Sequence, residues 1–262
     1  MDHFVKPEPG TCLVTGAASG IGAAVARVLA ERGITVAAAD RDVVQLRETV
    51  EKLTADGLHV EGFPVDVTSE AEVESLVDAV EQRLGPIRYL VNAAGVLRLG
   101  EVKDFSFEDW RAVFMTNTTG VFLVSRAVVK RMVPHSAGAI VTVASNAGGT
   151  PRQEMAAYGA SKAAASMFTK SLGLEVSRYG IRCNVVSPGS TDTPMLRSMW
   201  QDQNGASSTI EGNPDAYRVG IPLRKLAAPS DVADAVVFLL SEHASHITLH
   251  ELTVDGGAGL GR

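Results

Sequence analysis

Tyr158 and Lys162 are four residues apart in an alanine-rich segment, and this spacing favours acid–base chemistry. On a helix the lysine lies one turn after the tyrosine, about 40° around the axis and about 6 Å along it. A phenol titrates at about 10 in water, but a nearby positive charge stabilises the phenolate and lowers that pKa. Ser145 ends the apolar run 139–144, so its hydroxyl is expected to project from a strand end. By itself, Tyr-x-x-x-Lys also fits a solvated helix face, so the other motifs must decide.

A glycine-rich turn follows the first predicted strand. The apolar segment 11–15 runs into TGxxxGxG, and an alanine-rich helix follows from about residue 23 to 32. Glycines let the backbone approach a pyrophosphate closely, and the helix N-terminus supplies free N–H groups. Such a turn can also serve packing alone, but its place in a βαβ unit favours a dinucleotide. The contacts expected here are Gly16, Ser19, Gly20, Ile21 and Gly22.

Asp40 ends the second predicted strand, 34–39, eighteen residues after Gly22. A carboxylate at this place accepts hydrogen bonds from both ribose hydroxyls of an adenosine and repels a 2′-phosphate. No lysine or arginine lies between Gly16 and Gly22 to bind such a phosphate, so the cofactor is predicted to be NAD rather than NADP. Arg41 weakens this prediction slightly. Alternatively, Asp40 caps the helix that begins near Asp42.

Further cofactor contacts are expected from other strand ends. The strand 58–65 ends before Asp66, which is in reach of an adenine amino group or stabilises the next helix N-terminus. The strand 86–91 delivers a small-residue segment beside the adenosine ribose, and its Asn92 can tie neighbouring strands. The strand 181–187 leads to residues that can wrap a nicotinamide carboxamide. The contacts from these three places are Asp66, Val67, Asn92, Ala93, Gly95, Pro188, Gly189, Thr191 and Thr193.

Two stretches depart from regular secondary-structure patterns. Asn117, followed by two threonines, is a poor choice inside the helical region 107–133, so it marks a kink or a site, although a solvent-facing asparagine is equally allowed. The segment 194–221 is long and polar at its centre, with Met195, Met199 and Trp200 before that centre. Such an insertion beside a site is more often a lid than a linker.

Strands and helices alternate along the whole chain, with a helix at 229–241 and a seventh strand at 250–254. Without linkers or repeats, this pattern predicts one α/β domain over residues 1–262, a doubly wound Rossmann-type fold with a seven-stranded parallel sheet. The strand ends at Gly16, Asp40, Asn92, Ser145 and Pro188 then open on one edge, where ligands bind in such folds.

Composition excludes several other classes. A net charge of −6 argues against a nucleic-acid surface or a polybasic membrane anchor. No apolar run reaches the roughly 18 residues of a membrane span, and the first residues carry no signal-peptide pattern. Cys12 and Cys183 each fall in a predicted buried strand and are expected to be reduced core residues, not a disulfide or metal pair. The sequence therefore favours a cytoplasmic protein without a metal.

Taken together, these motifs resemble the short-chain dehydrogenase/reductase family over nearly the whole chain. The matching residues are TGAASGIG (15–22), NAAG (92–95), Asn117, Ser145, YGASK (158–162) and PG (188–189). The resemblance implies that Tyr158 is the acid–base residue, with Lys162 lowering its pKa and holding the nicotinamide ribose. It also implies that Ser145 orients the reacting oxygen and that Asn117 supports a proton-relay water. A homotetramer is implied as well, with the helices around Asn117 and Tyr158 paired across subunits.

Four stretches (90–100, 138–152, 182–195 and 245–257) resemble a branch of this family that oxidises 2,3-dihydro-2,3-dihydroxybenzoate, a cyclohexadiene diol carboxylate, in catecholate siderophore biosynthesis. The resemblance is weakest over 1–9, 41–60 and 201–216. A carboxylate favours a bidentate guanidinium, and either Arg98 or Arg152 can supply it, unless both are ordinary surface arginines. Met155, Met199 and Trp200 are expected to wall the ring, or only to fill core. Alternatives that share the motifs are a 3-oxoacyl reductase, a sugar or steroid alcohol dehydrogenase, and a nucleotide-sensing scaffold.

Overall fold

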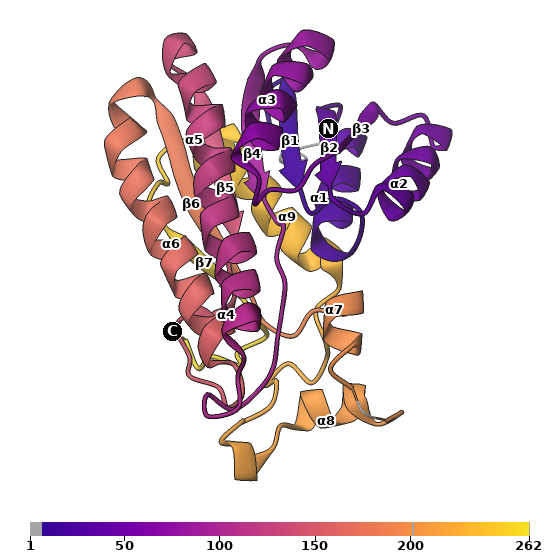
Figure 1. Cartoon of the computed structure of the whole chain (residues 1–262). Helices are drawn as coiled ribbons and strands as arrows, with labels where there is room; N and C mark the ends of the chain where they lie inside the picture. The colour runs from indigo at the N-terminus through magenta and orange to yellow at the C-terminus, as the bar shows by residue number, and fades with distance from the viewer. Residues whose placement is uncertain (1–6, 201, 262) are drawn as a thin grey trace.

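The sheet has seven strands, all parallel, in the order β3-β2-β1-β4-β5-β6-β7 (Figure 1). The computed structural model describes residues 7–200 and 202–261. The strands are β1 Thr11–Thr15, β2 Thr35–Asp40, β3 Val60–Pro64, β4 Ile87–Asn92, β5 Gly138–Val143, β6 Ile181–Pro188 and β7 Glu251–Val254. The predicted doubly wound fold with a seven-stranded parallel sheet is confirmed.

Helices cover both faces of the sheet. The helices are α1 Gly20–Glu31, α2 Val43–Ala55, α3 Glu70–Leu84, α4 Phe107–Phe114, α5 Val121–Met132, α6 Ala156–Val176, α7 Pro194–Arg197, α8 Gly205–Glu211 and α9 Pro229–Leu240. One core joins the sheet to α1, α2 and α9, and the other joins it to α3, α5 and α6. The helix expected from residue 23 begins at Gly20, because the glycine-rich turn itself enters the first helical turn.

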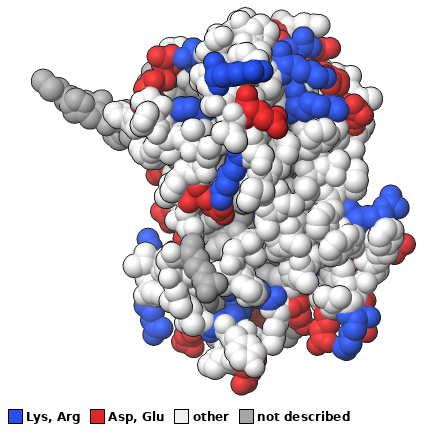
Figure 2. All heavy atoms as spheres, turned by 90° about the vertical axis from the view of Figure 1, so that its left-hand side faces the viewer, with Lys and Arg blue, Asp and Glu red and all other residues white. Residues whose placement is uncertain are grey.

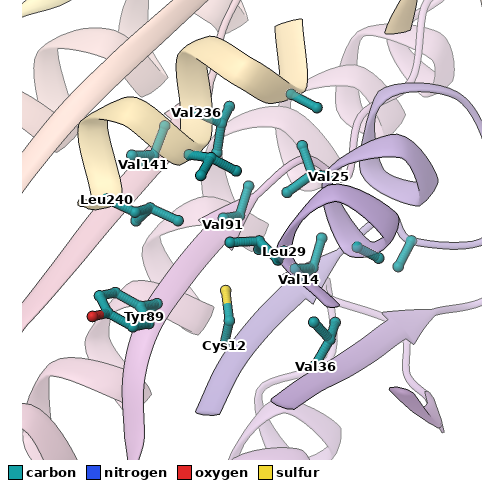
Figure 3. Close-up of a cluster of buried hydrophobic side chains, with 14 of the residues drawn as sticks. Cys12, Val14, Val25, Leu29, Val36, Tyr89, Val91, Val141, Val236 and Leu240 are labelled. Atoms are coloured by element: carbon teal, nitrogen blue, oxygen red, sulfur yellow. The ribbon is translucent and has the colours of Figure 1, made fainter. Parts of the chain in front are cut away.

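Successive residues of a central strand enter opposite cores, because strand side chains alternate between the two faces of the sheet. Cys12 and Val14 contact the α1 and α9 side with Leu29 and Val236 (Figure 3), whereas Leu13 enters the other core. Cys183 also lies in that other core, so the sheet separates the two cysteines. Both are free and buried, as expected, and burial raises the pKa of the Cys183 thiol to about 12.

The helical region around Asn117 is continuous but not regular. A π-helical turn, Met115–Gly120, separates α4 from α5, which confirms the irregularity predicted there. The whole run Phe107–His135 is long and apolar enough to cross a membrane by length and composition, contrary to the expectation that no such stretch exists. However, 56% of its most apolar window is buried inside the protein, and α5 packs against β4. The apolar character of this run is therefore explained by the core.

The strand order reverses between β1 and β4. The chain proceeds outward from β1 to β3 and then returns to β4 beside β1, so the loops after β1 and β4 leave in opposite directions. A crevice forms at such a switch point, at the carboxyl ends of the strands. The segments after β1, β2, β4, β5 and β6 all reach this edge, where α7 and α8 also project from the sheet (Figure 1).

Candidate active site

Two adjoining cavities lie at the carboxyl edge of the sheet. The first, here called the long cleft, has a volume of about 320 Å³ and extends from Asp40 and Asp66 to Tyr158 and Lys162. The second, here called the inner pocket, has a volume of about 110 Å³. Both are lined by Ile21, Ala144, Tyr158, Thr193 and Met195. The tyrosine therefore stands where the two cavities meet.

The floor of the long cleft is formed by glycine residues, so backbone atoms face the cavity there. Gly16 has a φ of 70°, and a Cβ placed on it would lie 2.6 Å from the Ala94 nitrogen. A Cβ on Gly22 would lie 2.0 Å from the Gly16 carbonyl oxygen. Only glycine fits at both positions, because any side chain there would push the turn apart. All five residues predicted for this turn line the cleft.

Asp40 lies at one end of the cleft with its carboxylate held by backbone. Its two oxygens accept hydrogen bonds from the N–H groups of Ala18 and Asp42, each at 3.0 Å. The alternative that Asp40 caps the next helix is wrong, since Asp42 is the N-cap of α2 and accepts from the Gln45 N–H at 3.0 Å. Asp40 is thus fixed by the glycine-rich turn and faces the cleft.

The wall opposite is formed by the ends of β3 and β4. Asp66, Val67, Ala93 and Gly95 line the cleft as predicted. Asn92 does not: its side-chain amide is buried and donates to the hydroxyls of Ser125 (2.9 Å) and Thr142 (3.4 Å). The physical reason is strand alternation, because Asn92 is the last residue of β4 and its side chain points to the face of the sheet that α5 covers. Its alternative role of tying neighbouring elements is confirmed.

Tyr158, Ser145 and Lys162 meet at the junction of the cavities. The Ser145 hydroxyl hydrogen-bonds to the phenol and also accepts from the Ala147 N–H at 3.2 Å. The Lys162 ammonium donates to the Val143 carbonyl at 2.9 Å and lies 5.9 Å from the centre of the Tyr158 ring. The predicted one-turn relation on α6 therefore brings the lysine near the tyrosine without a direct bond.

The pKa shifts at this junction differ from the prediction. Burial raises the pKa of the Tyr158 phenol, and the hydrogen bond from Ser145 opposes that rise. Burial also lowers the pKa of the Lys162 ammonium to about 8. The expected lowering of the tyrosine pKa by the lysine is thus not what the structure shows. The reason is that α6 and β5 bury the lysine as well, which weakens its own charged form.

Asn117 supports the site from below and is fully buried. Its amide accepts from the Val96 N–H at 2.8 Å, and donates to the Val96 carbonyl at 2.9 Å and the Ser161 hydroxyl at 3.0 Å. Both N–H donors of the side chain are therefore used by protein, so any relay water must use the backbone or the remaining lone pair. A Cβ on Gly95 would lie 3.2 Å from the Lys162 nitrogen and 3.4 Å from the Asn117 oxygen, which places all three together.

The inner pocket includes three of the five residues predicted for the substrate. Arg152, Met155 and Met199 line it, as do four residues predicted for the cofactor: Pro188, Gly189, Thr191 and Thr193. Arg98 does not, because its side chain is 50% exposed and pairs with Asp109 at 3.4 Å. Trp200 does not either, since its ring packs against Gly205. These two residues therefore lie outside the lining of the inner pocket.

Sequence reasoning missed Arg218, which also lines the inner pocket. It lies in the segment 194–221, whose residue 201 is outside the described part of the chain. No spacing or strand end marks this arginine, so only the fold brings it to the pocket. Leu97 and Asn146 were also missed, although both lie within stretches that the resemblance singled out.

The residues of the long cleft fit a nicotinamide dinucleotide. The bare glycine floor suits a pyrophosphate, and Asp40 suits a ribose at one end. Lys162 and Tyr158 lie at the other end, next to the inner pocket. Among the described residues, no group of three or more His, Cys, Asp or Glu side chains is arranged to hold a metal ion.

Comparisons with known proteins agree with this geometry. The family model described as short chain dehydrogenase matches residues 10–204. The chain is 55% identical over 254 residues to 2,3-dihydro-2,3-dihydroxybenzoate dehydrogenase of Bacillus subtilis (strain 168), covering 97% of each chain. It is 41% identical over 251 residues to the vibriobactin-specific 2,3-dihydro-2,3-dihydroxybenzoate dehydrogenase of Vibrio cholerae, covering 95% of each.

A solved structure gives the same architecture. A crystal structure of a variant of actinorhodin polyketide ketoreductase with NADPH matches with a TM-score of 0.89 and 36% sequence identity. The match covers 98% of this chain and 99% of that one. The fold is thus shared with a ketoreductase whose crystal structure was solved with NADPH.

Proposed function

The chain belongs to the short-chain dehydrogenase family, and we propose that it oxidises 2,3-dihydro-2,3-dihydroxybenzoate to 2,3-dihydroxybenzoate with NAD, in catecholate siderophore biosynthesis. One observation carries this proposal beyond the family. The inner pocket joins the catalytic pair Tyr158 and Ser145 to the guanidinium of Arg152, on a scale suited to one small ring. A carboxylate bound by that guanidinium would place the ring beside the phenol.

In the proposed reaction, deprotonated Tyr158 accepts the proton of a ring hydroxyl while the C–H bond of the same carbon breaks. A bound nicotinamide supplies the hydride acceptor. Ser145 orients the reacting oxygen by hydrogen bonding, and its hydrogen bond to Tyr158 also favours the phenolate. Lys162 holds the ribose. The ketone that forms tautomerises to a catechol, and the aromatic ring gained makes the overall step effectively one-way.

The choice of NAD is supported by Asp40. Its carboxylate faces the cleft and is fixed by two backbone N–H groups, so it is positioned to accept bonds from ribose hydroxyls. A 2′-phosphate at the same place would meet this negative charge at close range. The other cofactor contacts proposed are the lining residues of the turn and wall described above, with Pro188, Gly189, Thr191 and Thr193 at the nicotinamide end.

The charge of the inner pocket favours this substrate over those of related enzymes. A sugar alcohol, a steroid or a neutral acyl chain has no anionic group to pair with the guanidinium of Arg152. Covering that charge without a partner would cost free energy of desolvation. A carboxylated diol satisfies it. Met155 and Met199 then provide apolar walls for the ring.

We also propose a cytoplasmic homotetramer in which α5 and α6 pair across subunits. The view from the side of these helices shows a broad surface with few charges across the middle of the molecule (Figure 2). Large apolar side chains are exposed on the two helices, with Phe122, Met167 and Leu174 at 39%, 64% and 69%. Exposed large apolar side chains on neighbouring helices support an interface at this face.

The proposed function is tested by a substrate panel. Purified protein with NAD is given the dihydrodiol acid, the same diol without its carboxylate, and simple cyclohexanols, and NADH formation is measured. The acid should have the highest kcat/KM by at least about tenfold, as expected for one charge-assisted contact. Equal rates on cyclohexanols, or no reaction with the acid, would contradict the proposal.

A further inference from the structure

Two guanidinium groups face the same small pocket. Arg152 follows β5 and Arg218 belongs to the segment 212–220, so their backbones are far apart in sequence, yet both line the inner pocket. Within the described part of the chain, neither side chain forms a hydrogen bond or an ion pair. In contrast, Arg98 and Arg197 are paired with Asp109 and Asp192.

We propose that Arg152 and Arg218 bind the substrate carboxylate together, each with one guanidinium facing the inner pocket. This inference rests on the proposed function and adds a second residue to its specificity. A planar carboxylate offers two oxygens, and one guanidinium on each side can bind both.

The segment that carries Arg218 is built to present it. A short antiparallel bridge links Asn213 and Arg218 through two backbone hydrogen bonds of 2.9 Å. Glycines stand at both ends of the segment: a Cβ on Gly212 would lie 2.4 Å from the Arg218 carbonyl, and one on Gly220 would lie 2.5 Å from the Ile210 carbonyl. Both have positive φ. The segment is therefore a closed loop whose ends touch, and its backbone holds Arg218 at a defined place.

No acidic side chain in the pocket neutralises the pair. Asp255 is close enough to stabilise the charge of Arg152, but its oxygens accept hydrogen bonds from Asn146 at 3.1 Å, Gly257 at 2.9 Å and Gly259 at 2.7 Å. Burial lowers the pKa of Arg152, and the like charge of Arg218 lowers it further. Two cations held together without a shared anion repel each other, which a bound carboxylate would reverse.

The loop is anchored to the same turn that holds Asp255. The Leu223 N–H donates to the Gly256 carbonyl at 3.1 Å, and a Cβ on Gly256 would meet the Ile221 side chain at 2.8 Å. Ile221 is buried and follows directly after the loop. The base of the loop is thus fixed against the turn that contains Asp255 and Gly256.

Steady-state kinetics test the proposal with matched substrates. Arg218→Met should raise KM for the diol acid by about 10- to 100-fold, the loss expected for a charge-assisted contact, and should leave the neutral diol unchanged. Arg218→Lys, which keeps the charge, should recover part of the loss. Arg98→Met, an arginine outside the pocket, is the control and should behave as the parent protein. Equal effects on acid and neutral diol, or no effect on the acid, would overturn the paired role.

Benzoate binding separates this inference from the proposed reaction, because it needs no turnover. Calorimetric titration of benzoate into the protein with NAD should show binding to the parent and Arg98→Met proteins and weaker binding to Arg152→Met and Arg218→Met. If the diol acid is not oxidised but benzoate binding depends on both arginines, the anion site stands and the reaction is wrong. If the acid is oxidised and benzoate binds equally to Arg218→Met, the reaction stands and the paired site is wrong.

Discussion

The long cleft and the inner pocket share one tyrosine but are built in different ways. The long cleft is formed by strand ends and the turn into α1, and its carboxylate Asp40 is held by two backbone N–H groups. The inner pocket is formed by loops after β4, β5 and β6, together with Met195, Leu196, Met199 and Arg218. Its two cations, Arg152 and Arg218, have no hydrogen-bonding partner among the described residues. In the long cleft the backbone already supplies hydrogen-bonding partners for the charged group. In the inner pocket the charged groups obtain a partner only when an anionic ligand binds.

This difference has an energetic meaning. Groups already hydrogen-bonded to backbone lose little when the ligand leaves, so the long cleft keeps its shape. The unpaired guanidiniums of Arg152 and Arg218 gain most of their stabilisation from the ligand. Selectivity for the reacting molecule is therefore concentrated in the inner pocket.

Replacing Tyr158 with phenylalanine should give the largest effect, because this residue belongs to both cavities. Removing the phenol oxygen removes the acid–base group, and kcat should fall by about 10²- to 10⁴-fold. Binding of NAD and of benzoate, measured by titration, should stay within about twofold, since neither cavity loses a charge. Tyr179→Phe, on a turn outside both cavities, is the control; unchanged turnover of Tyr158→Phe would remove the tyrosine from the mechanism.

Gly22→Ala should damage the long cleft alone. The added methyl would lie 2.0 Å from the Gly16 carbonyl, so the turn must move, at a cost of about 3 kcal/mol in the free energy of unfolding. Denaturant unfolding measures this cost, and NAD titration should show weaker binding. Gly149→Ala is the matched control, because a Cβ there meets nothing within 4 Å. Intact NAD binding by Gly22→Ala would contradict the assignment of the floor.

The cleft was largely readable from the sequence because each of its parts is local. Strand, glycine-rich turn and helix follow one another in the chain, and Asp40 lies at the next strand end, so periodicity and spacing locate them. The irregularity at Asn117 was predicted for the same reason, as a short run of residues that disfavours an α-helix, although the sequence did not specify a π-helical turn.

The inner pocket was less readable because long-range packing decides it. Arg98 and Arg152 both follow motif strands, but only the fold shows that Asp109 holds the first at the surface and that the second faces the pocket. Arg218 has no local signal at all. The direction of the Tyr158 pKa shift was also wrong, since the depth at which α6 buries its lysine cannot be judged from a four-residue spacing.

The buried Lys162, at the junction of the two cavities, should make the free energy of unfolding depend on pH. Its pKa is about 8 in the folded chain and near 10.5 when unfolded, so between these values the unfolded chain binds more protons. Stability therefore rises with pH across this window, by about 2 kcal/mol from roughly pH 8 to pH 10. Unfolding free energies of parent and Lys162→Met proteins, subtracted at each pH, should show this rise; a flat difference would mean that the ammonium is not buried.

Asp40→Ala should have the smallest effect, and it should change only the preference between NAD and NADP. Without the carboxylate, a 2′-phosphate no longer meets a negative charge, so the ratio of kcat/KM for NAD over NADP should fall by about tenfold.

The same substitution leaves the N–H groups of Ala18 and Asp42 without acceptors, so part of the loss with NAD will come from the turn itself. Asp40→Asn separates these causes, because its oxygen can still accept one bond while its charge is gone. If Asp40→Asn relaxes the cofactor preference as much as alanine does, charge sets the preference. If only Asp40→Ala relaxes the cofactor preference, the preference is set by the hydrogen bonds that fix the glycine-rich turn rather than by the charge of Asp40. In either case the KM for the acid should not change, because Asp40 does not line the inner pocket.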